Sequence, residues 1–210
     1  MPVEKTVVGQ LQTNCYFFYK EENKDCLLID PGDDAGYIMN QLGELGLKPR
    51  AILATHGHFD HLLAATELKL AYRVPFYLSQ KDIKILKRQQ RTAKFFTGLK
   101  ADPPPPVDRF LKEGQKLEVN GLVFVVITTP GHTPGSVSFY CQGEGLIFSG
   151  DLIFLGGGRG RTDLEGSNPG ELKNSIKKIL SLPAATIIYP GHGRPTTVKK
   201  ERKYWPELLK

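Results

Sequence analysis

Four side chains of types that bind metals stand within six residues of one another in the stretch Thr55–His61. They follow the pattern His-x-His-x-Asp-His and are His56, His58, Asp60 and His61. Neutral imidazole is a good donor to zinc, and Asp adds a hard oxygen. Apolar residues lie on both sides of the stretch, at 51–54 and 62–65. A polar cluster between two apolar runs indicates a metal site on a loop that leaves a buried strand and enters a helix.

The spacing of the first two histidines requires the chain to turn between them. Residues two apart in an extended strand share a face but lie about 7 Å apart, which is too far for two nitrogens on one metal. Gly57 permits the turn between His56 and His58. Asp60 and His61 then fall at the start of the next helix and can point to a second metal. A histidine-rich loop without metal is the simpler alternative, but four ligands in six positions favour the metal site.

The other two histidines of the chain stand in turns rich in proline and glycine. His132 lies in the segment 129–135, which reads TPGHTPG, and His192 lies in the segment 189–193, which reads YPGHG. Both segments follow apolar runs. No histidine is therefore left for another role, and the composition supports the same metal site.

One pattern recurs along the chain, in which an apolar strand runs into a short loop that carries a His or an Asp. Strands are expected at 26–29, 51–54, 123–127, 146–148 and 187–189, and their loops carry Asp30, His56, His132, Asp151 and His192. If these strands lie in neighbouring layers, their ends gather the five side chains along one edge of the sheets. Rigid strands commonly position functional loops in this way.

The net charge of +6 raises the question of a nucleic-acid partner. The densest basic stretch, 81–100, is predicted to be helical, with an apolar face that packs on the core and consists of Ile83, Ile85, Leu86, Phe95 and Phe96. Ser79 with Asp82 resembles a capping box for a helix that extends to about Gln90. A solvated amphipathic helix is favoured over a phosphate-binding surface, so nucleic acid is the weaker alternative.

Length and composition indicate one domain, residues 1–210, with ample length for a core. A hydrophobic fraction of 40% and a charged fraction of 24% are ordinary for a soluble globular protein. The N-terminus lacks the pattern of a signal peptide, and no apolar run approaches membrane-spanning length. Cys15, Cys26 and Cys141 have apolar or aromatic neighbours and no CxxC spacing, which is typical of reduced core thiols in a cytoplasmic protein.

Several ordered motifs of the sequence resemble the metallo-β-lactamase superfamily over almost the whole chain. They are Asp30-Pro31-Gly32, His56-x-His58-x-Asp60-His61, His132, Asp151 and His192. The resemblance implies an α/β fold, a four-layer αβ/βα sandwich in which two mixed β-sheets are flanked by helices. It also implies a two-metal site. One metal is expected on His56, His58 and His132, the other on Asp60, His61 and His192, with Asp151 bridging both and Asp30 supporting the site from behind.

Within the superfamily the sequence is most similar to glyoxalase II and its short bacterial relatives, through segments 129–136, 158–163 and 189–193. This likeness implies hydrolysis of a thioester such as S-D-lactoylglutathione by a metal-bound hydroxide, with Asp60 and Asp151 as catalytic residues. Asp151 stands where true β-lactamases of the superfamily typically have Cys. Two divalent ions are expected, zinc first, with iron or manganese as alternatives.

The substrate is expected to be a small molecule. Arg161 lies in a glycine-rich loop and is a candidate for binding an anionic substrate group, although an arginine bonded to loop carbonyls is an equal alternative. Full-length glyoxalase II enzymes carry a further helical region that binds glutathione, and this chain ends 18 residues after His192. Other activities left open are a persulfide dioxygenase with one iron, a lactonase or phosphodiesterase, including a nuclease, and a non-enzymatic binding module. The oligomeric state does not follow from the sequence.

Overall fold

Two six-stranded β-sheets form the centre of the computed structural model, which describes residues 2–119 and 121–208. In spatial order, the first sheet contains β1 (Val3–Val8), β2 (Thr13–Tyr19), β3 (Asp25–Ile29), β4 (Lys48–Leu53), β5 (Phe76–Ser79) and β6 (Arg109–Leu111). The second contains β12 (Thr196–Thr197), β11 (Ile187–Pro190), β10 (Leu146–Gly150), β9 (Val137–Cys141), β8 (Leu122–Thr128) and β7 (Lys116–Val119). Both sheets combine parallel and antiparallel pairs.

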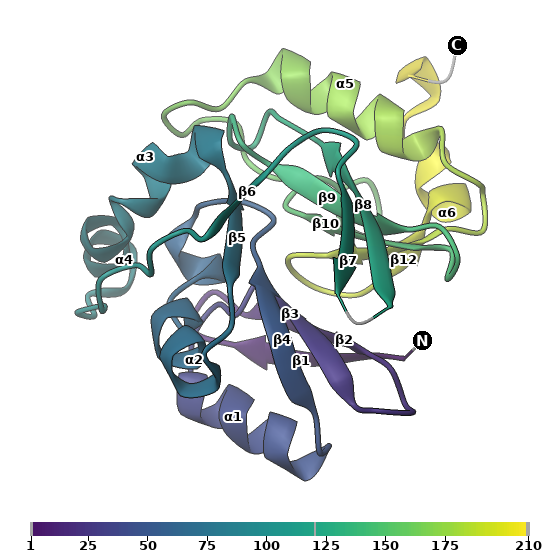
Figure 1. The fold of residues 1–210 in the computed structure, drawn as a ribbon. Coiled ribbons are helices and arrows are strands. Elements are labelled where there is room, and N and C mark those ends of the chain that lie inside the picture. Colours follow the sequence, from purple (N-terminus) through teal and green to yellow (C-terminus); the bar gives the residue numbers. More distant parts are fainter. Residues whose placement is uncertain (1, 120, 209–210) are drawn as a thin grey trace.

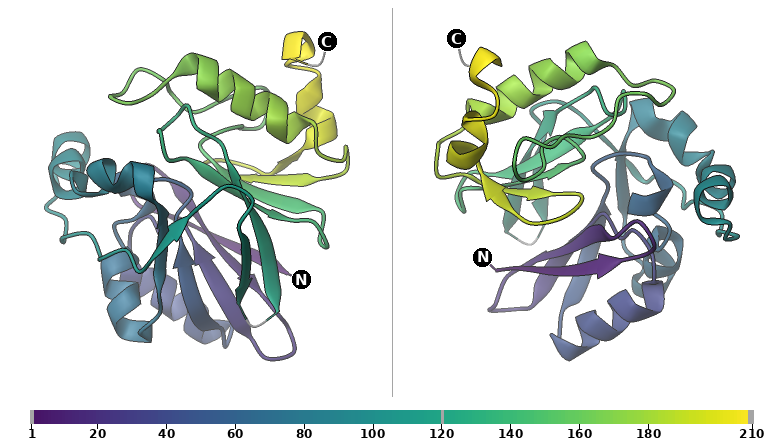
Figure 2. Two further views of the ribbon diagram at one scale, coloured as in Figure 1. Left: turned by 45° about the horizontal axis from the view of Figure 1, so that its top comes forward. Right: turned by 180° about the vertical axis from the view of Figure 1, so that it is seen from behind.

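Helices cover the outer faces of the two sheets, as Figures 1 and 2 show. The first sheet carries α1 (Ala35–Glu44) and α2 (Ala65–Tyr72), and the second carries α5 (Pro169–Leu180) and α6 (Val198–Arg202). The short helices α3 (Ile83–Leu86) and α4 (Gln89–Thr97) lie to one side, beyond the β5–β6 edge. Single 3-10 turns occur at Phe59–His61, Gln80–Asp82 and Pro206–Leu208.

Three apolar clusters separate the four layers. Strand β2 shows how they arise, because successive side chains of a strand point to opposite faces. Phe17 belongs to the cluster shared with α1 and α2, whereas Tyr16 and Phe18 belong to the cluster between the sheets. Ile147 of β10 faces the third cluster, under α5 and α6. These layers confirm the predicted αβ/βα sandwich.

The C-terminal ends of the functional strands meet at one edge of the sandwich. Strands β3 and β4 run parallel in the first sheet. In the second sheet β10 and β11 are parallel, and β8 shares their direction because β9 is antiparallel to both β8 and β10. Backbone bonds join the sheets at this edge, from Asn14 N to the Gly191 carbonyl (2.8 Å) and from Val137 N to the Thr55 carbonyl (2.8 Å). The loops that carry His or Asp after these strands therefore gather along one edge of the sheets, as predicted.

The helical predictions after the first histidines were partly wrong. Asp60 and His61 lie in the 3-10 turn Phe59–His61, and α2 begins only at Ala65. The stretch 81–100 is divided between a 3-10 turn, α3 and α4. Leu86 is buried as predicted, but Phe95 and Phe96 are 81% and 47% exposed, so the predicted apolar face does not continue along α4.

The capping box predicted at Ser79 was also wrong. The Ser79 side chain makes no capping bond, and the Asp82 carboxylate accepts bonds from Gly57, Thr133 and Gly135 and not from the backbone of Ser79. The dipeptide Asn120-Gly121 is a strong hairpin signal in the sequence, and the hairpin of β7 and β8 that it predicts is confirmed. Asn120 itself lies outside the described residues. The pair Asn168-Pro169 predicts the start of a helix, and Asn168 caps α5 by accepting bonds from the backbone of Gly170 and Glu171.

The prediction that the cysteines are core thiols without disulfide bonds is confirmed, since Cys15, Cys26 and Cys141 are free and buried. Within residues 2–119 and 121–208, no helix has both the length and the apolar character needed to cross a membrane.

Candidate metal centre

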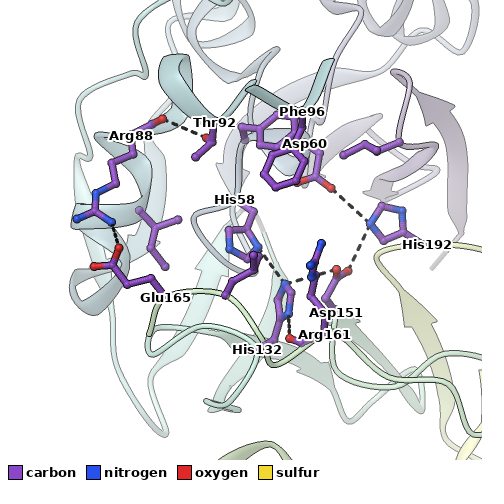
Figure 3. A pocket seen from close by; sticks show the side chains of 14 residues that line it. His58, Asp60, Arg88, Thr92, Phe96, His132, Asp151, Arg161, Glu165 and His192 are labelled. Carbon is purple, nitrogen blue, oxygen red and sulfur yellow. Dashed lines mark hydrogen bonds and ion pairs between the residues drawn. The ribbon is translucent and has the colours of Figure 1, made fainter. Parts of the chain in front are cut away.

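The seven residues predicted as metal ligands converge on the edge where the strands end. The β4–α2 connection carries four of them, and the loops after β8, β10 and β11 carry one each: His56, His58, Asp60 and His61, then His132, Asp151 and His192. Figure 3 shows that His58, His132, Asp151, His192 and Asp60 turn toward one another. The fold thus collects side chains from both halves of the sequence.

His56, His58 and His132 form the first donor set, with one ring nitrogen of each within 4.8 Å of the others. His132 Nδ1 donates to the Arg161 carbonyl at 2.8 Å, since a carbonyl only accepts. In the neutral ring, the form that binds a metal, Nε2 of His132 is then the acceptor, and it lies 2.9 Å from His58 Nδ1. His56 Nε2 is buried and has no hydrogen-bond partner.

Asp60, His61 and His192 form the second donor set, again within 4.8 Å. Asp60 Oδ2 lies 3.6 Å from His61 Nε2 and 3.5 Å from His192 Nε2. The other ring nitrogens are directed away from the centre, because His61 Nδ1 lies 3.0 Å from Asp30 Oδ2 and His192 Nδ1 lies 3.3 Å from the Gln12 carbonyl. Both Nε2 atoms therefore face Asp60.

Asp151 lies between the two sets. Its Oδ1 is 3.4 Å from His61 Nε2 and 3.7 Å from His192 Nε2, and its Oδ2 is 3.6 Å from His132 Nε2. One carboxylate thus contacts both groups of histidines, as expected of a bridging ligand.

The unpaired atoms at the centre fit metal ions. His56 Nε2, His61 Nε2 and Asp151 Oδ1 are all buried without a hydrogen-bond partner. Buried polar atoms are rarely left unpaired, because desolvation without a replacement bond is costly. Contacts of 3.4–3.7 Å are also too long for hydrogen bonds. Imidazole and carboxylate donors suit zinc, iron and manganese alike, so the donors present fit two divalent cations.

The electrostatics of the first set favour neutral imidazoles. Burial, together with the neighbouring histidines, lowers the pKa of His56 well below its ordinary value and that of His58 to about 4. Metals bind the neutral form of histidine. At neutral pH these two rings are therefore ready to bind without releasing a proton.

In the second set and Asp151, the interactions between carboxylates and histidines outweigh the effect of burial on the pKa values. Burial alone would raise the pKa values of Asp60 and Asp151, but His61 and the other neighbouring histidines hold both below the ordinary value. Burial acts to lower the pKa values of His61 and His192, yet the adjacent carboxylates raise both. The carboxylates thus favour positive charge at this set, which a bound metal ion would supply.

Asp30 supports His61 from behind, as the resemblance implied. Its Oδ1 accepts a bond from Thr55 N at 2.7 Å, and its Oδ2 accepts from Thr55 Oγ1 at 2.6 Å and from His61 Nδ1. Asp30, His56 and His61 also lie close enough to hold an ion. The oxygens of Asp30 are already occupied, however, so its contact with His61 fixes which ring nitrogen points to the centre.

Asp82 is a supporting residue whose position the sequence did not reveal. It is fully buried. Its carboxylate accepts bonds from Gly57 N (2.8 Å), Thr133 Oγ1 (2.7 Å) and Gly135 N (2.7 Å). Burial raises its pKa despite these bonds. Asp82 ties the loop of the first histidines to the loop of His132. The one signal in the sequence was its place as the only acidic residue between Glu67 and Asp102.

A pocket of about 470 Å³ opens from the donors to the surface. Its wall is apolar at Leu11, Phe59, Ile85, Phe96 and Leu164 and charged at Arg88, Arg161 and Glu165. The Arg161 side chain is exposed and makes two bonds to the carboxylate of Asp163, at 2.7 and 2.6 Å. The structure thus places Arg161 on the pocket wall, while its carbonyl orients His132.

The sequence model of the metallo-beta-lactamase superfamily matches residues 8–192. The chain belongs to this superfamily. Its relatives include a probable metallo-hydrolase, YqgX of Bacillus subtilis (strain 168), which is 37% identical and aligns over 96% of this chain and 94% of the relative. Hydroxyacylglutathione hydrolase GloC of Haemophilus influenzae (strain ATCC 51907 / DSM 11121 / KW20 / Rd) is 35% identical over 99% of this chain and 98% of its own.

Solved structures of the superfamily share the same fold. BLEG-1 B3 metallo-beta-lactamase has a TM-score of 0.92 and 37% identity, with all of both chains covered. TTHA1623 in a di-iron-bound form has a TM-score of 0.87 and 40% identity, covering 96% of this chain and 98% of that one. These similarities extend across the strand ends that carry the donors, so the superfamily and the four-layer fold are established together.

Proposed function

We propose that the protein is a metal-dependent hydrolase with a dinuclear site that cleaves a thioester such as S-D-lactoylglutathione. The observation that carries the proposal is the pair of donor sets joined by Asp151 at the base of an open pocket. The relatives named as a metallo-hydrolase and as a hydroxyacylglutathione hydrolase support the reaction class and this substrate.

Each residue at the centre has an assigned role in this proposal. One ion would be held by His56, His58 and His132, a second by Asp60, His61 and His192, and Asp151 would contact both. Divalent ions bound there would lower the pKa of water and polarise a carbonyl group. Zinc is the first expectation, iron is supported by the di-iron form of TTHA1623, and manganese has compatible donors.

Asp60 is proposed as a catalytic residue as well as a ligand. Its side chain remains 15% exposed and borders the pocket. Its pKa is lowered, so the carboxylate is ionised at neutral pH and can orient the attacking water or accept its proton. Arg161, on the same wall, is proposed to meet an anionic part of the substrate.

The test is the hydrolysis of S-D-lactoylglutathione by metal-loaded protein, followed as loss of thioester absorbance, with Asp60→Ala as the control. The expected turnover is in the ordinary range of about 1–1000 per second, and it is lost in the control. A metal-loaded wild type no faster than Asp60→Ala would remove this substrate, and persulfide, lactone and phosphodiester substrates would follow in that order.

Hydrolysis of β-lactams is the second candidate, because the structure of a B3 metallo-beta-lactamase matches the whole chain. A β-lactam carbonyl would meet the same donors. A chromogenic cephalosporin assayed beside the thioester distinguishes the two, and we expect the thioester to have the higher kcat/KM.

A further inference from the structure

Arg88 and Glu165 form a charged pair at one side of the pocket. Arg88 stands between α3 and α4, and Glu165 lies in the connection from β10 to α5, 77 residues later. Arg88 Nη1 donates to Glu165 Oε2 at 2.5 Å. Figure 3 shows the pair across the pocket from His192, with His58 between them. A molecule that reaches from the donors past His58 would therefore end at this pair.

The guanidinium of Arg88 is incompletely used. Among the described residues it makes this one side-chain bond, although a guanidinium has five N–H donors in a planar fork that matches a carboxylate. Arg161, by contrast, uses two donors on Asp163 in its own loop. Among the described residues the Nε–Nη2 edge of Arg88 thus stays available for a carboxylate, whereas Asp163 takes that edge of Arg161 and leaves Arg161 only its Nη1 side for the anionic group proposed above.

The bond to Glu165 is one that a ligand can displace. The side chains of Arg88 and Glu165 are 51% and 79% exposed, and ion pairs between exposed side chains are weak because water and salt screen them. A carboxylate on a bound substrate can therefore form an ion pair with Arg88 without either charged group having to be buried. Glu165 then acts as a competitor for the same guanidinium.

The pocket that Arg88 borders has an apolar part to its wall. Phe96 stacks on Phe59 with ring centroids 5.8 Å apart and an interplanar angle of 12°, and Ile85 lines the same pocket. Such a surface suits hydrocarbon. The partial exposure of Phe96 thus has a functional explanation, because the ring forms part of the pocket rather than of the core.

We propose that Arg88 is a specificity-determining residue that binds a carboxylate on the substrate, separated by an apolar spacer from the carbonyl that reacts, and that Glu165 competes with this carboxylate. The inference rests on the proposed thioesterase function for the identity of the reacting bond. It assigns the substrate class as anionic thioesters whose negative charge is remote from the thioester.

The test compares two probes that differ in charge alone, the S-acetyl thioester of ω-mercaptohexanoic acid and that of its primary amide. KM is measured for both with metal-loaded wild type, Arg88→Gln, Glu165→Gln and Arg91→Gln. Arg91 is the matched control, because it is an exposed arginine on α4 that does not line this pocket. The measured quantity is the ratio of KM for the acid to KM for the amide.

The proposal predicts that this ratio rises about threefold to fivefold in Arg88→Gln, which corresponds to the loss of a charge pair at an exposed site. The ratio falls in Glu165→Gln and is unchanged in Arg91→Gln. If the pair merely braces the loop, the two variants lose the same bond and shift together. A shift in the same direction for Arg88→Gln and Glu165→Gln, or no shift in either, overturns the proposal.

A binding measurement separates this inference from the proposed reaction. The S-methyl thioether of ω-mercaptohexanoic acid cannot be hydrolysed, and its Kd is measured by calorimetry with the same four metal-loaded proteins. Opposite changes of Kd in Arg88→Gln and Glu165→Gln support the carboxylate site even if no thioester is cleaved. Equal Kd values in all four proteins refute it, whatever the outcome of the thioesterase assay.

Discussion

At the scale of single residues, the centre is defined by which nitrogen of each histidine carries a proton. His132 Nδ1 donates a hydrogen bond to the Arg161 carbonyl, and His61 Nδ1 donates one to Asp30. The opposite nitrogens then face Asp151. The sequence predicted these side chains as metal ligands, since His and Asp at such close spacing have few other uses. It did not identify the partners behind them, because a carbonyl or a distant Asp leaves no pattern.

The metal affinity of the two donor sets is expected to depend on Asp82, although this residue is not itself a ligand. In Asp82→Asn an NH2 group, which cannot accept a hydrogen bond, replaces one of the oxygens that accept from Gly57, Thr133 and Gly135. The two histidine loops therefore lose part of their shared support. We expect the metal affinity, measured by chelator competition, to fall about tenfold, as for other supporting groups.

Asp108→Asn is the control for this variant, because Asp108 also accepts a backbone bond, from Phe76 N, at the opposite end of β5. It should bind metal as the wild type does. An unchanged affinity in Asp82→Asn would show that the loops hold their geometry unaided.

The lowered pKa of His58 predicts a pH dependence of the metal-free protein. Its folded pKa is about 4, against 6.5 for the free side chain, so between these values the unfolded chain binds more protons. The stability that neutral His58 contributes is complete above pH 6.5 and is lost as the pH falls toward 4. His61 and His192, whose pKa values are raised, act in the opposite direction.

The contribution of His58 is therefore isolated by comparing the wild type with His58→Asn. We expect the free energy of unfolding in urea, with metal removed, to fall more between pH 7 and pH 5 in the wild type than in the variant. If the free energy of unfolding falls equally in both proteins, the lowered pKa of His58 is contradicted.

At the scale of elements, glycines allow the loops after the strands to meet. A Cβ on Gly191, just after β11, would collide with Asp151 Oδ1 and would lie 2.7 Å from His61 Cε1. The sequence showed the loops and the strands before them, because apolar runs of strand length are regular. It did not show the close approach of loops that are far apart in the chain.

Gly191→Ala should displace Asp151 and so lower the metal content. We expect it also to lower the free energy of unfolding by about 1–3 kcal/mol, as overpacking commonly does. Gly36→Ala on α1 is the matched control, since no atom lies within 4 Å of the added methyl group, and alanine favours the helix by about 1 kcal/mol. Thermal unfolding and metal analysis of both variants provide the comparison. Normal metal content in Gly191→Ala would mean that the loops can yield.

The helices between 81 and 100 show where an amphipathic pattern misleads. The sequence predicted that Phe95 and Phe96 cover the core, but they lie on α4, where both are exposed. Apolar residues beside a pocket and apolar residues on a core give the same periodicity. The roles inferred for Arg88 and Phe96 therefore required the fold.

At the scale of the whole molecule, the two halves of the chain form two sheets that contribute to one centre. The first half supplies His56, His58, Asp60 and His61, and the second supplies His132, Asp151 and His192. The order of these motifs was sufficient to predict the four layers, because the resemblance covers nearly the entire chain. Strand order and register emerged only from the structure, since they depend on contacts between the halves.

The metal content per chain of the purified protein, with His58→Ala and His192→Ala measured beside it, tests the dinuclear centre most directly. These residues come from different halves of the chain and from different donor sets. The account predicts up to two equivalents of zinc, iron or manganese in the wild type, and the loss of most of this metal in His58→Ala and of at least one equivalent in His192→Ala. Full metal content in both variants would contradict the assignment of the ligands and the function built on it.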